Sequence, residues 1–153
     1  MNNSEFEKLV IKNEDTLYRV SMSMLKNEAD AQDAVHDAIL IAYTKLGSLK
    51  REEYFSSWIT RILINCCKKQ LKMKKRIVDI GDNLPDVASR DNPYISVEIG
   101  EAINSLPEKI RIAVILYYVE DYSVKEIKRI LKIPEGTVKS RLSKGRQLLK
   151  EKL

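Results

Sequence analysis

Serine and threonine alternate with lysine and arginine near the end of the chain, in the segment PEGTVKSRLSKGRQLLK from Pro134 to Lys150. Val138, Leu142, Gly145 and Leu149 recur there at the spacing of one helix face, which leaves a polar face opposite. Small hydroxyl side chains let a helix come close to DNA, while lysine and arginine reach phosphates or guanine. The segment therefore predicts a DNA-contacting helix. Its candidate contacts are Thr137, Lys139, Ser140, Arg141, Ser143 and Lys144.

A shorter helical pattern precedes this segment, with Val124, Ile127 and Leu131 on one face, and the turn KIPEG joins the two helices. Two helices around a short turn, the second one basic, have the layout of a DNA-binding helix-turn-helix. Gly136 and Thr137 open the second helix, where free N–H groups and the helix dipole favour a phosphate. A basic helix that only faces solvent is the alternative interpretation.

A second basic segment lies between residues 50 and 78, with nine lysines and arginines against two glutamates. Apolar side chains from Phe55 to Cys66 keep helical spacing and predict one amphipathic helix over residues 55–73. The basic face of such a helix can hold the phosphates of a nucleic-acid strand. The same spacing favours burial of Phe55 and Trp58 over contact with a strand.

A third helix is predicted over residues 30–46, where an alanine-rich stripe repeats at helical spacing and Asp30 is the candidate N-cap. The opposite face combines carboxylates, the single histidine and an exposed leucine. That combination suits docking on a basic, partly apolar protein surface, and an acidic face open to solvent is the alternative. The residues of this docking face are Asp33, His36, Asp37, Leu40 and Thr44.

The elements that carry these faces are all expected to be helices. The 153 residues include only five glycines and four prolines, and no convincing strand pattern interrupts the helical spacing. Ile110, Ala113, Val114 and Tyr117, for example, share one predicted stripe. The periodicity lapses after Ile77, where turn-forming and acidic residues gather. The sequence thus predicts an all-α protein of two small helical domains, 1–77 and 98–153, joined by an acidic flexible linker over 78–97.

Composition restricts the classes of partner and compartment. The net charge of +5 and the two basic segments favour an anionic partner such as nucleic acid. Cys66 and Cys67 are adjacent and cannot bridge distant parts of the chain, which fits a reducing cytoplasm. No apolar run has the length of a signal peptide or a membrane span, so we expect a soluble, cytoplasmic protein.

Three stretches resemble motifs of bacterial sigma factors of the extracytoplasmic-function group, in the family's order. YSVKEIKRILKIPEGTVKSRLSKGRQLLK resembles the promoter-reading helix-turn-helix, and DAQDAVHDAILIAYTKL resembles the helix that grips core RNA polymerase. YFSSWITRILINCCKKQLKMKKR resembles the promoter-melting segment. The resemblance implies a two-domain sigma factor that binds core polymerase and directs promoter-specific initiation of transcription.

The resemblance also gives each face a role. The C-terminal helix would read the minus-thirty-five element of promoter DNA, while the docking face would bind the β′ clamp helices of polymerase, and the β flap is a further implied contact. The second basic helix and the loop before it would recognise and melt the minus-ten element, and the linker would thread the RNA exit channel. Candidate contacts to the minus-ten element are Lys50, Arg51, Glu52, Glu53, Asn65, Lys68, Lys69 and Lys72.

Regulation by an anti-sigma factor, often a membrane-bound one that would hold the protein at the membrane, is a further implication of the resemblance. Two positions depart from the family pattern: Lys128 replaces a small residue in the first helix of the pair, and Lys132 replaces the turn glycine. A lysine at a close helix crossing must extend its ammonium outward, and a non-glycine residue at a left-handed turn costs about 1 kcal/mol.

Three other classes of function explain fewer features of the sequence. A stand-alone helix-turn-helix regulator that binds an operator would need a dimerisation or ligand-sensing element in residues 1–100, where the polymerase-like motif lies. An enzyme would need a carboxylate cluster for a metal or a nucleophile with its base, and a helical adaptor would leave both basic segments unexplained. We therefore expect no catalytic residue, no metal or other cofactor, and no small-molecule substrate.

Overall fold

The computed structural model describes residues 1–78 and 97–153, and at residues 77 and 78 it describes the backbone alone. Every regular element in these ranges is a helix, so the predicted all-α class is confirmed. The chain divides into two compact units, Met1–Ala88 and Ser89–Leu153. The predicted linker, 78–97, lies outside the described residues except at its two ends.

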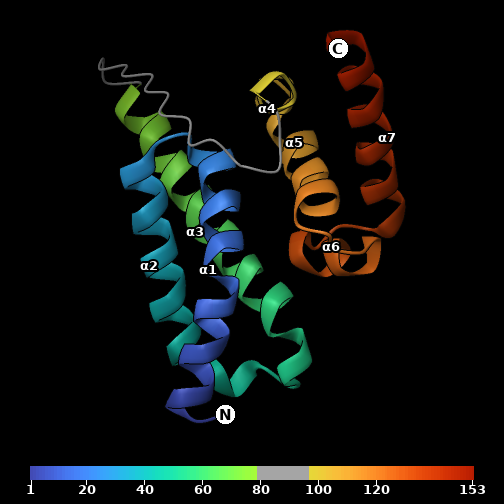
Figure 1. Cartoon of the computed structure of the whole chain (residues 1–153). Coiled ribbons are helices and arrows are strands. Elements are labelled where there is room, and N and C mark those ends of the chain that lie inside the picture. Colours follow the sequence, from blue (N-terminus) through green and yellow to red (C-terminus); the bar gives the residue numbers. More distant parts are fainter. Residues whose placement is uncertain (79–96) are drawn as a thin grey trace. The chain divides into compact units, whose positions relative to one another are not determined.

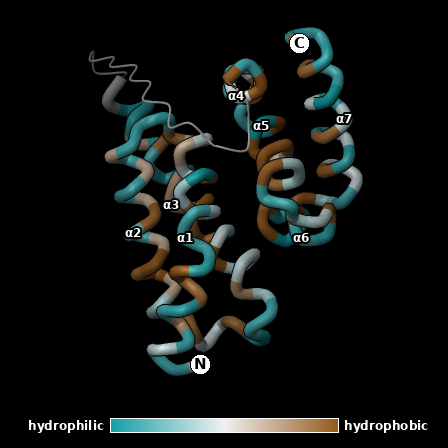
Figure 2. The backbone as a smooth tube through the Cα atoms, viewed as in Figure 1, coloured by the Kyte–Doolittle hydropathy of each residue, from teal (hydrophilic) through white to brown (hydrophobic). Residues whose placement is uncertain are grey.

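The N-terminal unit is a bundle of three long helices that pack side by side (Figure 1). They are α1 (Asn3–Leu25), α2 (Glu28–Thr44) and α3 (Phe55–Val78). Two short 3-10 turns, Leu46–Ser48 and Glu52–Tyr54, lie between α2 and α3. Hydrophilic and hydrophobic positions alternate along each helix, as Figure 2 shows, because each helix turns one stripe to the shared core. Core side chains include Leu17, Val20, Ala34, Ala38, Phe55, Ile59 and Leu63.

The start of α2 differs from the sequence prediction. Asn27 is the N-cap, and its side-chain oxygen accepts a hydrogen bond from the Asp30 backbone N–H at 2.9 Å. The prediction of Asp30 as the cap was therefore wrong, because Asn27 supplies the same acceptor three residues earlier, where the chain leaves the left-handed Lys26. Helix α2 accordingly begins at Glu28 and ends at Thr44 instead of spanning 30–46.

Asp30 instead connects α2 to α3. Its carboxylate forms an ion pair with the Lys74 ammonium at 2.7 Å, and its carbonyl accepts a hydrogen bond from the Gln70 side-chain amide at 3.1 Å. These contacts hold the C-terminal part of α3 against α2, and α3 continues to Val78, beyond the predicted end at residue 73. The basic half of α3 thus has a defined position within the unit.

The C-terminal unit contains α4 (Val97–Asn104), α5 (Glu108–Val114), a π-helical segment η3 (Ile115–Val119), α6 (Val124–Leu131) and α7 (Glu135–Lys152). Arg111 is buried at the bend between α4 and α5, where its guanidinium donates hydrogen bonds to the carbonyls of Leu106, at 3.0 Å, and Asn104, at 3.4 Å. Burial lowers the pKa of the Arg111 guanidinium, while Glu108 raises it. The cation therefore satisfies carbonyls at the end of α4 and fixes this bend.

One stripe position in this unit was predicted wrongly. Tyr117 is 37% exposed, although the α-helical spacing placed it on the buried stripe of α5. A π turn takes more residues than an α turn, so the segment Ile115–Val119 rotates this side chain away from the core. In α6, Ile127 is buried and Val124 and Leu131 are half-buried, while Ile130 is a buried residue that the predicted stripe did not include.

The helix-turn-helix of α6 and α7 forms as the sequence predicts. Ser123 and Glu126 form a capping box at the start of α6, with hydrogen bonds of 3.1 and 3.0 Å. The predicted left-handed residue is confirmed at Lys132, whose φ is 53°. Lys128 is exposed, so its side chain reaches solvent as expected. Helix α7 begins at Glu135, one residue before the predicted start.

Replacing Lys132 with glycine should stabilise the C-terminal unit by about 1 kcal/mol, because glycine adopts a positive φ without the steric cost that lysine incurs. Urea denaturation followed by far-UV circular dichroism measures the change. Lys128→Gly provides the control, because this residue lies inside α6 and glycine there should destabilise the helix. Equal losses of stability in both variants would contradict the predicted strain at Lys132.

Candidate nucleic-acid interface

The exposed face of α7 carries the side chains that the sequence assigned to DNA. Val138, Leu142 and Gly145 are buried, which turns the polar face of the helix outward. Lys139, Ser140, Ser143 and Lys144 are exposed, while Thr137 and Arg141 are half-buried at the edges of this face. Cations and hydroxyls therefore occupy one accessible helix surface, as groove binding requires.

The first turn of α7 differs in one respect from the prediction of free N–H groups. The Thr137 and Val138 N–H groups both donate to the Pro134 carbonyl, at 3.0 and 3.1 Å. These two N–H groups therefore already have an acceptor, in contrast to the prediction. Lys139 forms an i,i+4 ion pair with Glu135 at 3.7 Å, with both side chains largely exposed, and such a surface pair contributes little stability. Lys139 can therefore leave its partner for a phosphate.

Arg146 is a basic residue of α7 that the sequence analysis did not select. Its Nη1 donates a hydrogen bond of 2.9 Å to the hydroxyl oxygen of Tyr118. At about 100° per residue, Arg146 lies on the same flank of α7 as Lys139 and Ser143. The tyrosine thus restricts the conformations of a cation beside the exposed polar face of α7. Nothing in the sequence spacing indicated this contact, because it joins residues 28 positions apart.

The second basic face lies on α3. Phe55, Ile59 and Leu63 are buried, with exposed fractions of 0–1%. The predicted contacts Asn65, Lys68, Lys69 and Lys72 are all exposed. Helical spacing brings them to one side of α3, so the structure aligns an amide and three ammonium groups along a single track. A track of this kind matches the repeating charge of a nucleic-acid backbone.

The loop before α3 is exposed at each of its predicted contacts, Lys50, Arg51, Glu52 and Glu53. Arg51 Nη1 and Glu53 Oε1 form an ion pair at 3.1 Å, and both side chains are more than 60% exposed. Because water screens such a pair, its loss costs little. The arginine is therefore free to exchange its carboxylate partner for a base or a phosphate.

An aromatic cluster supports the end of the bundle near this loop. The Phe55 ring lies 5.9 Å from that of Phe6 and 5.8 Å from that of Trp58, and Phe6 in turn lies 5.6 Å from Tyr43. Phe55 is 1% exposed, which confirms its predicted role in the core, and Trp58 is half-buried. Contacts of this kind fix the position from which α3 and its loop begin.

The docking face of α2 lies opposite its alanine stripe. Ala31, Ala34, Ala38 and Ala42 are fully buried, because small side chains let α2 pack closely against α1 and α3. Asp33, His36, Asp37, Leu40 and Thr44 are all exposed. Leu40 is 65% exposed, a large fraction for a leucine that sits among acidic side chains.

Comparisons with known proteins identify the family of the chain. Residues 9–77 match the family model Sigma-70 region 2, and residues 96–149 match Sigma-70, region 4. The ECF RNA polymerase sigma factor SigM of Mycobacterium tuberculosis is 30% identical over 146 residues, which cover 94% of this chain and 74% of SigM. SigW of Bacillus subtilis, another ECF sigma factor, is 29% identical over 91% of this chain and 83% of its own length. The chain belongs to the ECF RNA polymerase sigma factors.

A solved structure resembles this sigma factor over nearly its whole length. The sigma factor RpoE of Bartonella quintana, in complex with the anti-sigma factor NepR, has a TM-score of 0.85 and 26% identity, with 96% of this chain and 95% of that chain covered. Among the described residues, no helix is both long and apolar enough to cross a membrane. The same residues contain no group of three His, Cys, Asp or Glu side chains that could hold a metal ion.

Tyr43 extends the docking face of the sigma factor. It is 49% exposed, and its hydroxyl donates a hydrogen bond to Asn3 Oδ1 at 3.3 Å while its ring packs on Phe6. Its position three residues after Leu40 places it beside that side chain on α2. An aromatic residue held in place in this way is a typical anchor of protein interfaces. Sequence spacing alone did not distinguish Tyr43 from a core residue.

The two cysteines of the sigma factor differ in burial, and Cys67, not Cys66, is the packing residue of the pair. Burial raises the pKa of the Cys67 thiol from 9.0 to about 12, with a further contribution from Cys66. Burial also raises the pKa of the Cys66 thiol, as does Asp37, while Lys69 and Lys45 oppose the shift. Asp37 on α2 and Lys69 on α3 therefore both lie close enough to Cys66 to influence the pKa of its thiol.

Alkylation by iodoacetamide should separate the two thiols, because the thiolate is the reactive form. In the folded protein Cys66 should react slowly, and Cys67 should remain protected up to a pH near 12, whereas in urea both should react from about pH 9 upward. Between pH 9 and 12 the Cys67 thiol keeps its proton in the folded state and loses it in the unfolded state. The free energy of unfolding should therefore fall as the pH rises from 9 towards 12. Mass spectrometry of the products measures each rate. Equal rates at Cys67 with and without urea would contradict its burial.

Proposed function

We propose that this sigma factor docks on core RNA polymerase through α2, recognises the minus-ten element through α3 and its preceding loop, and reads the minus-thirty-five element through α7. The observation that carries the proposal is the joint exposure of three faces of different chemistry in one chain, one acidic and apolar and two basic. A protein that only bound an operator would have no use for the exposed Leu40 among carboxylates.

Promoter specificity is then divided between the two units. Lys139, Ser140 and Lys144 read duplex DNA in the major groove, because hydroxyls and cations on one helix face combine close approach with reach. Ser143 lies on the same exposed face, and Thr137 and Arg141 complete that contact at its edges. In the other unit, Arg51 and its neighbours in the loop select the bases of the opened strand, while the lysines of α3 hold its phosphates.

The two units also bind different parts of RNA polymerase. The docking face of α2 binds the β′ clamp helices, with Leu40 in an apolar contact and Asp33 and Asp37 opposite basic side chains. The C-terminal unit meets the β flap. The sigma factor acts in the cytoplasm on these macromolecules, without a cofactor or a small-molecule substrate.

An anti-sigma factor is a further proposed partner. The Bartonella quintana relative forms a complex with the anti-sigma factor NepR, which supports an inhibitor of the same class for this chain. Such an inhibitor would cover Asp37 and Leu40, or the exposed face around Lys144, and a membrane-bound one would hold the sigma factor at the membrane. Covering either face would block a step that initiation requires.

Run-off transcription with bacterial core polymerase and a library of promoter fragments tests the proposed function. Protein-dependent transcripts that share upstream motifs are the expected result. Ser140→Glu should reduce them at least about tenfold, because it places a carboxylate against DNA phosphates. Ser4→Glu, an exposed position at the start of α1, provides the matched control and should leave transcription unchanged. Tight operator binding without any protein-dependent transcript would establish a stand-alone regulator instead.

A further inference from the structure

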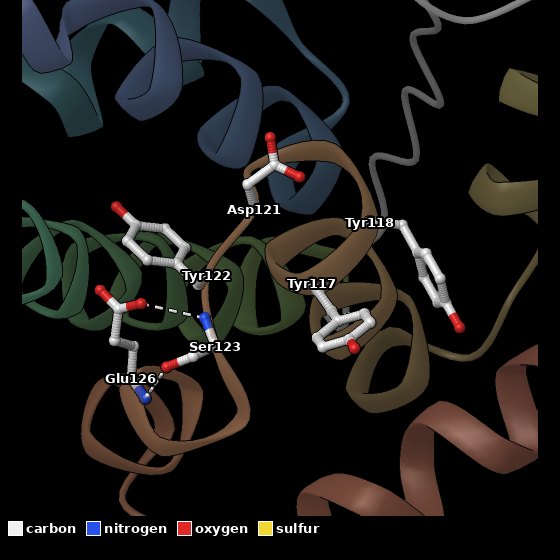
Figure 3. Close-up of a pocket in the computed structure, with 6 residues that line it drawn as sticks. All are labelled: Tyr117, Tyr118, Asp121, Tyr122, Ser123 and Glu126. Carbon is white, nitrogen blue, oxygen red and sulfur yellow. Dashed lines mark hydrogen bonds between the residues drawn. The ribbon is translucent and has the colours of Figure 1, made fainter.

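A pocket opens on the C-terminal unit where the π-helical segment meets α6, and none of the residues assigned above to DNA is among those that line it. Its volume is about 400 Å³, within the range of roughly 300–1,000 Å³ that is usual for small-ligand sites. Figure 3 shows the side chains around it. Three tyrosines, two acids and a serine line the pocket, and no basic residue does: Tyr117, Tyr118, Asp121, Tyr122, Ser123 and Glu126.

The backbone explains how two consecutive tyrosines reach the surface. The Glu120 N–H donates to the Ile115 carbonyl at 3.0 Å, and the Tyr122 N–H reaches back to the Leu116 carbonyl at 2.9 Å, so the helix widens before it ends. Tyr117 and Tyr118 are 37% and 48% exposed as a result, whereas Tyr122 is buried. The rings of the two exposed tyrosines meet edge to face, with centroids 4.9 Å apart.

The charge of the pocket is negative. Asp121 is exposed, with a φ of 59°, and forms no ion pair within the described part of the chain. Glu126 uses one carboxylate oxygen to accept a hydrogen bond from the Ser123 N–H at 3.0 Å, as Figure 3 shows, which leaves its second oxygen for a ligand. Two carboxylates beside exposed aromatic rings attract a cation and repel the phosphates of DNA.

The protein already contains one example of the chemistry that this site favours. Arg146 donates a hydrogen bond to the Tyr118 hydroxyl at 2.9 Å, so one tyrosine of the pocket already accepts from a guanidinium. Both tyrosines of the pair line the pocket together with its two carboxylates. A second guanidinium there would find a tyrosine ring and carboxylate acceptors among the side chains that line the pocket.

We propose that this pocket binds an arginine side chain presented by a protein partner. A planar guanidinium stacks on an aromatic face and donates several hydrogen bonds to carboxylates, and it loses less hydration on binding than an ammonium does. Arginine therefore fits the combination of Tyr117, Asp121 and Glu126 better than lysine does. The site extends the interactions of the C-terminal unit beyond DNA, and it stands whether or not the proposed promoter contacts are correct.

Nuclear magnetic resonance titration of the full ¹⁵N-labelled chain with N-acetyl-arginine amide tests the proposal. Saturable shifts at the amides of residues 117–126 are expected, with a dissociation constant on the order of 1 mM for this isolated side chain. The matched neutral probe is N-acetyl-citrulline amide, which keeps the shape and loses the charge. Citrulline should shift the same amides at least about threefold more weakly.

Two variants complete the test. Asp121→Asn keeps the size of the side chain and tolerates a positive φ, and Tyr117→Leu removes the ring; each should weaken arginine binding about three- to fivefold. Asp15→Asn, an exposed acid on α1, is the control and should change nothing at residues 117–126. The proposal fails if arginine gives no saturable shift, if citrulline binds equally well, or if Asp121→Asn binds arginine as the wild type does.

Discussion

Replacing Gly145 with alanine should destabilise the C-terminal unit by about 1–3 kcal/mol, although alanine ordinarily favours a helix over glycine by about 1 kcal/mol. A Cβ atom at this position would lie 2.5 Å from Val114 Cγ2 and 3.3 Å from Ile110 Cγ2. Val114 is 1% exposed and belongs to α5, so neither helix can yield without disturbing the core. The close approach of α5 and α7 at Gly145 therefore outweighs the gain in helix propensity.

Gly136→Ala is the matched control, because Gly136 lies in the same helix and an added Cβ meets no atom within 4 Å. That variant should be as stable as the wild type or more stable by up to about 1 kcal/mol. Trp58, the only tryptophan, lies in the other unit, so its fluorescence reports the N-terminal unit while circular dichroism reports both. In Gly145→Ala the urea transition should shift in circular dichroism and not in tryptophan fluorescence. A stabilised Gly145→Ala variant would show that α5 and α7 separate more readily than their contact indicates.

The same substitution should also affect the proposed binding of DNA. Gly145 holds the buried side of α7 to α5, and Ser140 and Lys144 lie on the side turned to solvent. A shift of α7 away from α5 would displace these side chains relative to α6. We therefore expect Gly145→Ala to weaken binding of duplex DNA even at temperatures where the unit stays folded.

The helix periods were predictable from the sequence because they depend on local spacing, and so was the exposure of the three faces that follow from them. In α2, for example, the helical spacing that buries Ala34 and Ala38 also turns the opposite side chains to solvent, namely Asp33, Asp37 and Leu40. Helix ends were predicted less well. Asn27 and Asp30 are both good caps by residue type, and only the left-handed turn at Lys26 decides between them.

Features that depend on an irregular backbone or on contacts between distant residues could not be predicted from the sequence. Nothing in the spacing of apolar residues indicates a π turn, so Tyr117 was expected in the core and the pocket beside it was not expected at all. Similarly, Tyr118 meets Arg146 across a separation of 28 residues. Lys132 is the exception, because its left-handed conformation followed from the glycine that the family pattern has there.

Replacing Leu40 with aspartate should reduce the affinity for core polymerase at least about tenfold, which corresponds to about 1.4 kcal/mol. The exposed leucine of the docking face would lose its apolar contact, and a new carboxylate would have to be desolvated beside Asp37 at the interface. Because Leu40 is 65% exposed, the fold should tolerate the change. Fluorescence anisotropy of labelled sigma factor titrated with core polymerase measures the affinity, and circular dichroism verifies the fold.

Ile11→Asp is the control for this variant, since Ile11 is 61% exposed on α1 of the same unit and undergoes the same change from an apolar side chain to a charge. Its affinity for polymerase should match that of the wild type. Equal losses in both variants would mean that polymerase contacts the bundle on more than the docking face. If Leu40→Asp binds normally while Ile11→Asp does not, polymerase docks on α1. A selective loss in Leu40→Asp would also separate docking from DNA reading, because the exposed side chains of α7 lie in the other unit and remain unchanged.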